Sequence, residues 1–364
     1  MYTSLQQFFT TGFLAAALLI AAPSYADQPE HDHGHPVQEQ INEAEHQIEQ
    51  NLEKHEEEFN IGQMIMHHIA DSHEWEFTHG VVLPLPVILY SEDRGLEVFS
   101  SSNFHNDHHA YNGYHLVHGD SEKIVPEDSS REIIDISITK NVASMILSAI
   151  ILILIFTSIG SAYQKNKGKA PKGFQSAMEV VILFIRDDVV KPNIGPNYEK
   201  YLPYMLTLFF FILVNNILGL LPGAANVTGN IAVTMTLAVI TFIIVHLNAN
   251  KHYYKHLVSP TGVPGALLPV MIPVEIVGVF MKPFSLMVRL FANMTAGHII
   301  LLSLFGLIFI FQSFMIAPVI SLFALFLNLI EIMVAFIQAF IFTLLSSMYI
   351  GSAIEEHSHA DHGH

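Results

Sequence analysis

Five apolar stretches constrain the fold of this chain more than any other feature of its sequence. Three of them have the roughly 17–25 residues that a helix needs to cross a bilayer: residues 141–163, 202–221 and 231–247. The other two, residues 271–311 and 318–350, are longer than a perpendicular span needs. We therefore expect both to be strongly tilted or kinked, with Pro283 as a kink in the first. The sequence predicts an all-α polytopic membrane protein with five transmembrane helices.

Lysines indicate which ends of the spans face the cytoplasm. Four of them follow the first span: Lys165, Lys167, Lys169 and Lys172. Lys251 and Lys255 follow the third span. Short cytoplasmic loops carry an excess of positive charge, so both ends are expected on the cytoplasmic side. With five spans, the carboxyl terminus is then cytoplasmic and the region before the first span is exported.

Residues 174–190 carry a further apolar pattern, which does not predict a membrane-spanning helix. Phe174, Met178 and Ile185 fall largely on one side of a helix, and polar residues such as Arg186 interrupt the sequence. This pattern is typical of an amphipathic helix that lies at the membrane interface.

An exported extension is predicted before the first span. Residues 1–26 combine an apolar run with small residues at Ser24 and Ala26, which predicts a secretory signal peptide. An uncleaved anchor is the alternative, because no lysine or arginine precedes the run. Residues 27–135 hold 24 acidic residues against 4 lysines and arginines, and 14 of the 22 histidines lie before residue 120. Residues 27–135 are therefore expected to form an acidic, histidine-rich periplasmic extension.

Local patterns subdivide the chain further. In residues 27–80, Ile41, Ala44, Ile48 and Leu52 have helical spacing, which predicts an exposed helix flanked by mobile ends. In residues 81–119, two strand patterns flank a Ser-Glu-Asp-Arg-Gly turn and predict a hairpin in a small β-rich unit: residues 87–90 and 96–99. Residues 136–352 are assigned to the transmembrane domain, and residues 353–364 to a polar cytoplasmic tail.

Composition excludes several classes of function. The chain is 51% hydrophobic and 13% charged, which is too apolar for a soluble protein of 364 residues. It has no cysteine, so thiolate metal sites and thiol nucleophiles are excluded. The net charge of −17 argues against a nucleic-acid partner, which requires a basic patch.

Ionisable residues inside the last two spans are the candidate functional groups, because each costs several kcal/mol at membrane depth. Glu275, Lys282, Arg289 and Asn293 follow one stripe of a helix. Glu275 and Arg289 are about 21 Å apart along the axis, so they cannot pair directly. Arginine cannot neutralise itself, so we expect a second subunit to supply its counter-charge. Small side chains around Arg289, including Ser285, would let another helix approach closely.

A second group of polar residues is expected on the exported half. His298 faces away from the Arg289 stripe, because nine residues correspond to about half a turn beyond two full turns. Glu331 and Gln338 share a face of the last span with Tyr349. If that span returns antiparallel, Glu331 lies near His298, and the pair could take up protons. The structural alternatives are that Arg289 extends to the interface and that Glu331, Gln338 and Asn293 only join helices.

Residues 282–298 carry a resemblance to a known family. They read Lys-Pro-Phe-Ser-Leu-Met-Val-Arg-Leu-Phe-Ala-Asn-Met-Thr-Ala-Gly-His, which resembles the signature of subunit a of F-type ATP synthases. The last helix, with Gln338, Tyr349 and the Glu355-Glu356-His357 end, is similar to the same family's carboxyl-terminal helix. The resemblance covers about the last 220 residues and extends weakly back to residue 141.

The resemblance implies a stator subunit that couples proton flow to ATP synthesis through two separate half-channels. Its partners would be the rotating c-ring, subunit b of the peripheral stalk and the lipid of the plasma membrane. Arg289 would attract the ring carboxylate and block a proton leak. Glu275 would serve the cytoplasmic half-channel, and His298, Glu331 and Gln338 the exported one. The resemblance implies no cofactor, no metal and no catalytic site in this chain, and the sequence has no phosphate-binding glycine loop.

Two positions depart from the family pattern. Many relatives carry the acid and the histidine of the uptake pair in the opposite places from His298 and Glu331, and some have an acid where Asn230 stands. The coupling ion, proton or sodium, stays open.

Two other functions are weighed against this one. The histidine-rich extension, with His31, His33 and His35, suits a metal transporter or sensor, but the last two spans offer only His298 as an imidazole ligand. A simple channel or scaffold does not explain an arginine without an in-chain carboxylate.

Overall fold

The computed structural model describes most of the chain from residue 70 onward. The described residues are 62, 70–78, 81–104, 110–117, 122–128, 131–165, 167–168, 170–221, 223–259, 264, 267–311 and 316–354. The predicted signal peptide, the predicted helix around residues 41–52 and residues 355–364 of the predicted tail lie outside this set.

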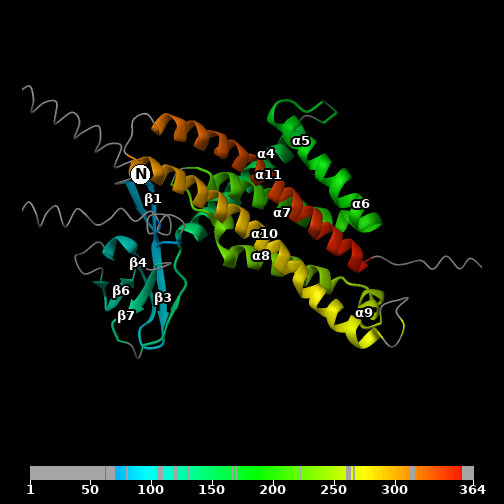
Figure 1. Cartoon of the computed structure of the whole chain (residues 1–364), viewed down its shortest axis with the longest axis horizontal. Coiled ribbons are helices and arrows are strands. Elements are labelled where there is room, and N and C mark those ends of the chain that lie inside the picture. The colour runs from blue at the N-terminus through cyan, green and yellow to red at the C-terminus, as the bar shows by residue number, and fades with distance from the viewer. Residues whose placement is uncertain are drawn as a thin grey trace, which may run out of the picture.

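Long helices make up the carboxyl-terminal two thirds of the chain (Figure 1). The main ones are α4 (Lys140–Lys165), α7 (Tyr198–Gly219), α8 (Ile231–Leu247), α10 (Leu268–Phe311) and α11 (Ala317–Ile354). Four helical stretches of the described chain are long and apolar enough to cross a membrane. Helix α8 makes a fifth candidate together with α9 (Lys251–Val258), which is bent from it by 102°. The prediction of a helical polytopic membrane protein is confirmed at this level.

The predicted amphipathic segment is helical and longer than expected. It comprises α5 (Phe174–Phe184), the π-helical turn η2 (Ile185–Val190) and α6 (Lys191–Ile194). The 3₁₀ turn η3 (Gly195–Asn197) joins it to α7. No residue of α5 is buried, whereas Ile185, Val189 and Val190 of η2 are completely covered. The second half of the segment therefore packs into the protein.

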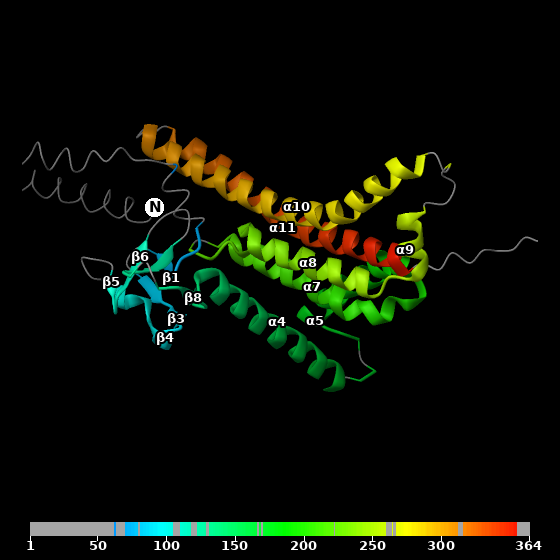
Figure 2. The same ribbon diagram turned by 90° about the horizontal axis from the view of Figure 1, so that it is seen from below.

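Helices α10 and α11 are too long for perpendicular spans. At about 1.5 Å per residue they extend for roughly 66 Å and 57 Å, about twice the thickness of the hydrocarbon layer. They run side by side in both views, and Figure 2 shows α10 bent near its middle. Pro273 and Pro283 both lie inside α10, where each removes a backbone hydrogen bond without ending the helix. The bend agrees with the predicted kink.

The helical core centres on α7. Met205 and Ile212 of α7 are fully buried, and they belong to one cluster with Leu290 of α10 and Ile350 of α11. Polar side chains join the helices inside this cluster. Asn215 of α7 donates to Ser148 Oγ of α4 at 3.0 Å, and such interhelical hydrogen bonds hold spans together where the hydrophobic effect cannot.

In the described residues before α4, eight short strands form a small β unit (Figure 1). They are β1 (Glu74–Thr78), β2 (Val81–Pro84), β3 (Pro86–Ser91), β4 (Gly95–Ser100), β5 (Ala110–Tyr111), β6 (Tyr114–Val117), β7 (Lys123–Pro126) and β8 (Ile133–Asp135), with the 3₁₀ turn η1 (Ser101–Phe104) after β4. They pair as β1-β2, β4-β3-β8 and β5-β6-β7. Val87, Leu89, Phe104, Tyr114 and Ile124 form the core of the unit.

The predicted hairpin in this unit is confirmed. β3 and β4 pair antiparallel from Pro86↔Ser100 to Ser91↔Gly95, around the turn expected from the sequence. The unit also extends beyond the predicted range, because β1 lies within residues 27–80, where an exposed helix with mobile ends was expected, and β7 and β8 lie after residue 119. The described residues 70–78 correct that expectation for the end of the segment.

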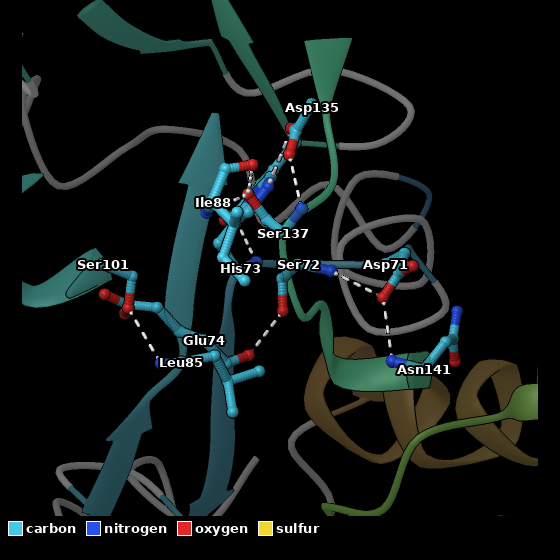
Figure 3. Close-up of polar contacts among 11 residues, drawn as sticks. Asp71, Ser72, His73, Glu74, Leu85, Ile88, Ser101, Asp135, Ser137 and Asn141 are labelled. Carbon is cyan, nitrogen blue, oxygen red and sulfur yellow. Dashed lines mark hydrogen bonds and ion pairs between the residues drawn. The ribbon is translucent and has the colours of Figure 1, made fainter. Parts of the chain in front are cut away.

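Hydrogen bonds tie the β unit to the first membrane helix (Figure 3). The Asp71 carboxylate accepts from the backbone N–H of Asn141, at the start of α4, at 3.0 Å. The Lys140 N–H donates to the Ser72 carbonyl at 2.8 Å. The free N–H groups at a helix start favour such acceptors and negative charge. On the other side, Trp75 Nε1 donates to the Gly223 carbonyl, in the loop between α7 and α8, at 2.9 Å.

His73 lies at the centre of this junction and is almost completely buried. Its Nε2 is 3.3 Å from Asp135 Oδ2, and its Nδ1 is 3.7 Å from Glu122 Oε2. Burial alone lowers the pKa of His73, but the hydrogen bonds and charges of Asp135 and Glu122 outweigh it and raise the pKa to about 9. The imidazolium is therefore a structural cation between two carboxylates.

We expect the junction to loosen in alkaline solution. The folded pKa of His73, about 9, exceeds the unfolded value of about 6.5. The stabilisation, on the order of 3 kcal/mol, is thus complete below about pH 6.5 and is lost as the pH rises through 9. Hydrogen exchange of β1 and β3 in the full chain, corrected for intrinsic rates, should show falling protection over this range. A His73→Phe variant should have a flat profile, and an equally steep profile in that variant would contradict the assignment.

Candidate functional site

Arg289 lies in the middle of α10, on the side that this chain leaves uncovered. Leu286 and Leu290, about 60° and 100° round the helix from it, are 2% and 1% exposed and pack into the helical core. Arg289 itself is exposed, and among the described residues it makes no hydrogen bond and no ion pair. The uncovered stripe continues with the small residues Ala292 and Ala296. A fixed cation thus points out of the chain near the centre of α10.

The neighbours of Arg289 on the predicted stripe are covered to different degrees. Asn293 is exposed beside it, while Ser285, Lys282 and Glu275 are partly buried. Tyr349 of α11 lies within electrostatic reach of Arg289, and the ammonium of Lys282 stands over the Tyr349 ring at 5.4 Å from its centroid. Arg289, Tyr349 and Lys282 are therefore consecutive neighbours across α10 and α11.

His298 and Glu331 come from different helices, and the structure brings their segments together. A Cβ atom on Gly297 would overlap the Glu331 carboxylate, so Glu331 lies against the backbone of the residue before His298. Glu331 Oε2 and His298 Nε2 are both buried atoms. Close by, Thr295 Oγ1 lies 3.4 Å from the Gly229 carbonyl. Glu331 therefore reaches α10 at the level that the antiparallel arrangement predicts.

Gln338 is buried, at 6% exposure, on the face of α11 that packs into the protein. Two more buried amides, Asn215 and Asn216, lie in the same region on α7, outside the two spans whose polar residues were predicted to be functional. Asn216 of α7 is completely buried and donates to the Ala335 carbonyl of α11 at 3.1 Å. Its Oδ1 accepts from Thr228, in the 3₁₀ turn η4 (Val227–Gly229), at 2.7 Å. The adjacent Asn215 and Asn216 inside an apolar run were the available signal.

The two ends of the helical region carry different groups. The end of α11 meets the turn between α8 and α9, where the Asn250 N–H donates to the Ala353 carbonyl at 2.9 Å. The β unit meets the other end, at Gly223. Figure 2 shows the β unit and α9 at opposite ends of the helices. Lys165 of α4 and Lys251 of α9 belong to the end away from the β unit.

The described residues offer little for metal or nucleophilic chemistry. Among them, no group of three or more His, Asp or Glu side chains could hold a metal ion. The histidines of the metal hypothesis at positions 31, 33 and 35 lie outside the described residues. The described site presents one exposed arginine at the middle of α10, with Glu275 and His298 before and after it on the same helix.

Comparison with known proteins gives two family matches. Residues 142–351 match the family model described as ATP synthase A chain. Residues 64–144, which include the β unit, match a domain of unknown function, DUF8433.

Individual relatives point the same way. The chain is 51% identical over 238 residues to "ATP synthase subunit a" of Chloroherpeton thalassium, covering 63% of this chain and 71% of the relative. It is 43% identical over 309 residues to "ATP synthase subunit a" of Chlorobium phaeobacteroides, covering 83% and 79%. The protein of the same name from an Anaeromyxobacter species is 38% identical over 312 residues, covering 83% and 72%.

Proposed function

The chain belongs to the ATP synthase A chain family, and from this we propose that it is the proton-conducting stator subunit of a rotary ATP synthase. Protons would be taken up past His298 and Glu331, neutralise a carboxylate on a rotating c-ring, and leave near Glu275. Arg289 would separate the two half-channels. The chain would supply no catalytic site for ATP chemistry, and would couple proton flow to a separate catalytic head.

The uncovered position of Arg289 carries the proposal. A guanidinium stays charged at any physiological pH, and a charge at membrane depth costs several kcal/mol unless a partner compensates it. The described part of this chain supplies no carboxylate that pairs with Arg289. A carboxylate from another subunit would compensate the charge of Arg289. A rotating c-ring would bring such a carboxylate to Arg289 repeatedly.

The surface around Arg289 suits a moving partner. Ala292 and Ala296 beside it are exposed and small, which permits close approach of another helix. Around them, α11 exposes a broad apolar face, including Leu325, Leu329 and Met333. Such an apolar face with one cation would let a ring helix pass when its carboxylate is protonated and neutral. It would hold the helix only when that carboxylate is deprotonated.

The proton-exchanging groups lie on both sides of Arg289 along α10. Glu275 and His298 are separated by about 35 Å along the helix, so a proton cannot jump between them. A charge that crosses ~100 mV gains ~2.3 kcal/mol, and several such steps would supply the rotation. Subunit b of a peripheral stalk would hold the chain against this torque.

The positions of the lysines support an orientation. Lys165 and Lys251 lie at the end away from the β unit, next to the end of α11. The excess of positive charge in cytoplasmic loops would place this end in the cytoplasm and the β unit in the periplasm, in a multi-pass protein of the plasma membrane.

Cysteine cross-linking within the assembled complex tests the ring contact. Because the chain has no cysteine, Ala292→Cys and Ala296→Cys each introduce a single thiol on the uncovered face of α10. We expect both to form oxidant-induced cross-links with a cysteine placed beside the ring carboxylate. Ala339→Cys, at a position that is completely buried in α11, is the control and should give none. If neither exposed cysteine cross-links in an intact complex, the ring does not pass Arg289.

A further inference from the structure

A small pocket opens between four helices on the side of α10 that carries Lys282. Its polar lining comes from Thr241 and His246 of α8, Tyr253 of α9, Lys282 of α10 and Tyr349 of α11. The pocket has room for about one water molecule. His246 belongs to none of the groups considered so far, and it is the only imidazole among the residues that line this pocket.

One hydrogen bond determines which nitrogen of His246 can exchange a proton. Nδ1 lies 2.8 Å from the Phe242 carbonyl, four residues earlier in α8. A carbonyl oxygen can only accept, so Nδ1 carries the hydrogen and donates it. In the neutral ring, Nε2 then holds the free lone pair. The Phe242 ring, 4.0 Å away, and the Tyr253 ring, 6.0 Å away between centroids, hold the imidazole in place.

Two tyrosines of the pocket lining interact electrostatically with the groups at the two ends of the required path. Toward Arg289 the neighbour is Tyr349, which lines the pocket and is in electrostatic reach of the guanidinium. Toward α9 the neighbour is Tyr253, which also lines the pocket and is in electrostatic reach of the Glu275 carboxylate. His246 thus shares a pocket with one side chain that interacts with the central cation and one that interacts with the acid expected at the cytoplasmic surface.

We propose that His246 Nε2 carries protons between the ring and the cytoplasm, through water in this pocket. This rests on the function proposed above. In each transfer an O–H bond of a hydronium ion in the pocket breaks and an N–H bond forms at Nε2, which leaves a neutral water and gives an imidazolium. The same N–H bond then breaks and its proton forms an O–H bond with a water on the Glu275 side, which returns the ring to its neutral form. Nδ1 keeps its hydrogen on the Phe242 carbonyl throughout, so the proton arrives and leaves at one atom.

Lys282 favours rapid release from this atom. Its side chain lines the pocket, and its ammonium is held over the Tyr349 ring. The other titratable side chains in the lining are Tyr253 and Tyr349, both neutral phenols at physiological pH. A second positive charge beside Lys282 is unfavourable, so a proton accepted by His246 passes on.

His246→Asn is the sharpest test, because asparagines elsewhere in this chain make the same side-chain hydrogen bond to the carbonyl four residues earlier. Asn215 and Asn248 each donate to the carbonyl four residues earlier, at 2.8 Å in both cases. An asparagine at 246 can therefore keep the bond to Phe242 while it removes Nε2. His246→Gln is the second variant, and His256→Gln, at an exposed position in α9, is the matched control.

The measurement is ATP-driven acidification of inverted membrane vesicles, where the external buffer supplies protons to this pocket. For His246→Asn we expect an initial rate at least about tenfold below that of the unchanged protein at about pH 8. The loss should shrink toward about pH 6.5, where protons are abundant and the carrier matters less. His256→Gln should stay within about twofold of the unchanged protein at each pH.

Three outcomes would overturn the carrier role of His246. The first is an unchanged pumping rate in His246→Asn. The second is an equal fractional loss of its rate at every pH, which indicates an effect on packing alone. The third is normal pumping by His246→Gln when only the Asn variant fails to assemble. The proposed stator function is tested separately by Arg289. If Arg289→Ala abolishes pumping and His246→Asn does not affect it, the proton path avoids this pocket but the rotary function stands.

Discussion

Replacing Arg289 with Ala should reduce ATP-driven acidification of inverted vesicles by at least about a hundredfold, the scale seen when one preorganised charge-stabilising group is removed. Without the cation, a deprotonated ring carboxylate has no partner at mid-membrane, and the cost of exposing it there opposes rotation. The two proton-exchanging regions also lose the positive charge between them. Passive proton leak through the membrane sector, measured after the catalytic head is stripped off, should therefore rise.

Two variants at the same place separate charge from packing. Arg289→Lys keeps a cation but loses the planar fork that binds a carboxylate with two parallel hydrogen bonds, so we expect only partial recovery. Val288→Ala, next to it on the uncovered side, removes two methyl groups and should leave pumping within about twofold, as surface substitutions usually do. Normal pumping by Arg289→Ala in an assembled complex would rule out the stator function.

Gly351→Ala should destabilise the helical domain by about 1–3 kcal/mol or more and lower the yield of intact complex. Gly351 is buried in α11, and an added Cβ would overlap the backbone carbonyl oxygen of Asn193 and lie 2.9 Å from its carbon. Backbone atoms cannot turn aside as a side chain can, so α6 and α11 would have to separate. Thermal inactivation of the solubilised complex and its recovery after extraction are the measurements.

Two other glycines in membrane helices provide the control. A Cβ on Gly278 of α10 or Gly160 of α4 would meet no atom of the described chain within 4 Å. Alanine at either position should be neutral or slightly stabilising, because alanine favours helix over glycine by about 0.5–1 kcal/mol. Equal recovery of Gly351→Ala and these controls would show that the contact between α6 and α11 is not tight.

The sequence was most informative where one pattern had one physical meaning. The uncharged run after residue 140 predicted α4 to within two residues at each end, because only a helix satisfies its backbone in lipid. The strand pattern around the turn at residues 91–95 predicted β3 and β4 as a hairpin. In both cases the local pattern and the final environment agreed.

Other elements were missed although a local signal was present. Asn112 and Gly113 both have positive φ, at 53° and 81°, and form the two-residue turn between β5 and β6. Asn-Gly is the strongest short signal for such a turn, so this hairpin was predictable. β1 pairs with the neighbouring β2, but its hydrogen bond from Trp75 to Gly223 depends on a residue far along the chain, which no local pattern shows.

The candidate site divides in the same way. Arg289, Glu331 and their neighbours could be chosen from sequence alone, because ionisable residues stand out in apolar helices. Their surroundings could not. That Glu331 lies against Gly297, and that His246 shares a pocket with Lys282, follows from how α8, α10 and α11 cross. Helical periodicity shows which residues share a face of one helix. It does not show which other helix packs against that face.

The attachment of the β unit has a practical consequence for imaging and single-molecule work. The unit is fastened both to the start of α4, through Asp71 and Ser72, and to the loop after α7, through Trp75. Because these two attachments lie on separate parts of the helical domain, they prevent the β unit from rotating freely relative to the helices. A small epitope inserted in the exposed turn at residues 92–94 would therefore act as a fiducial marker, whose direction reports the tilt of the helices in the bilayer.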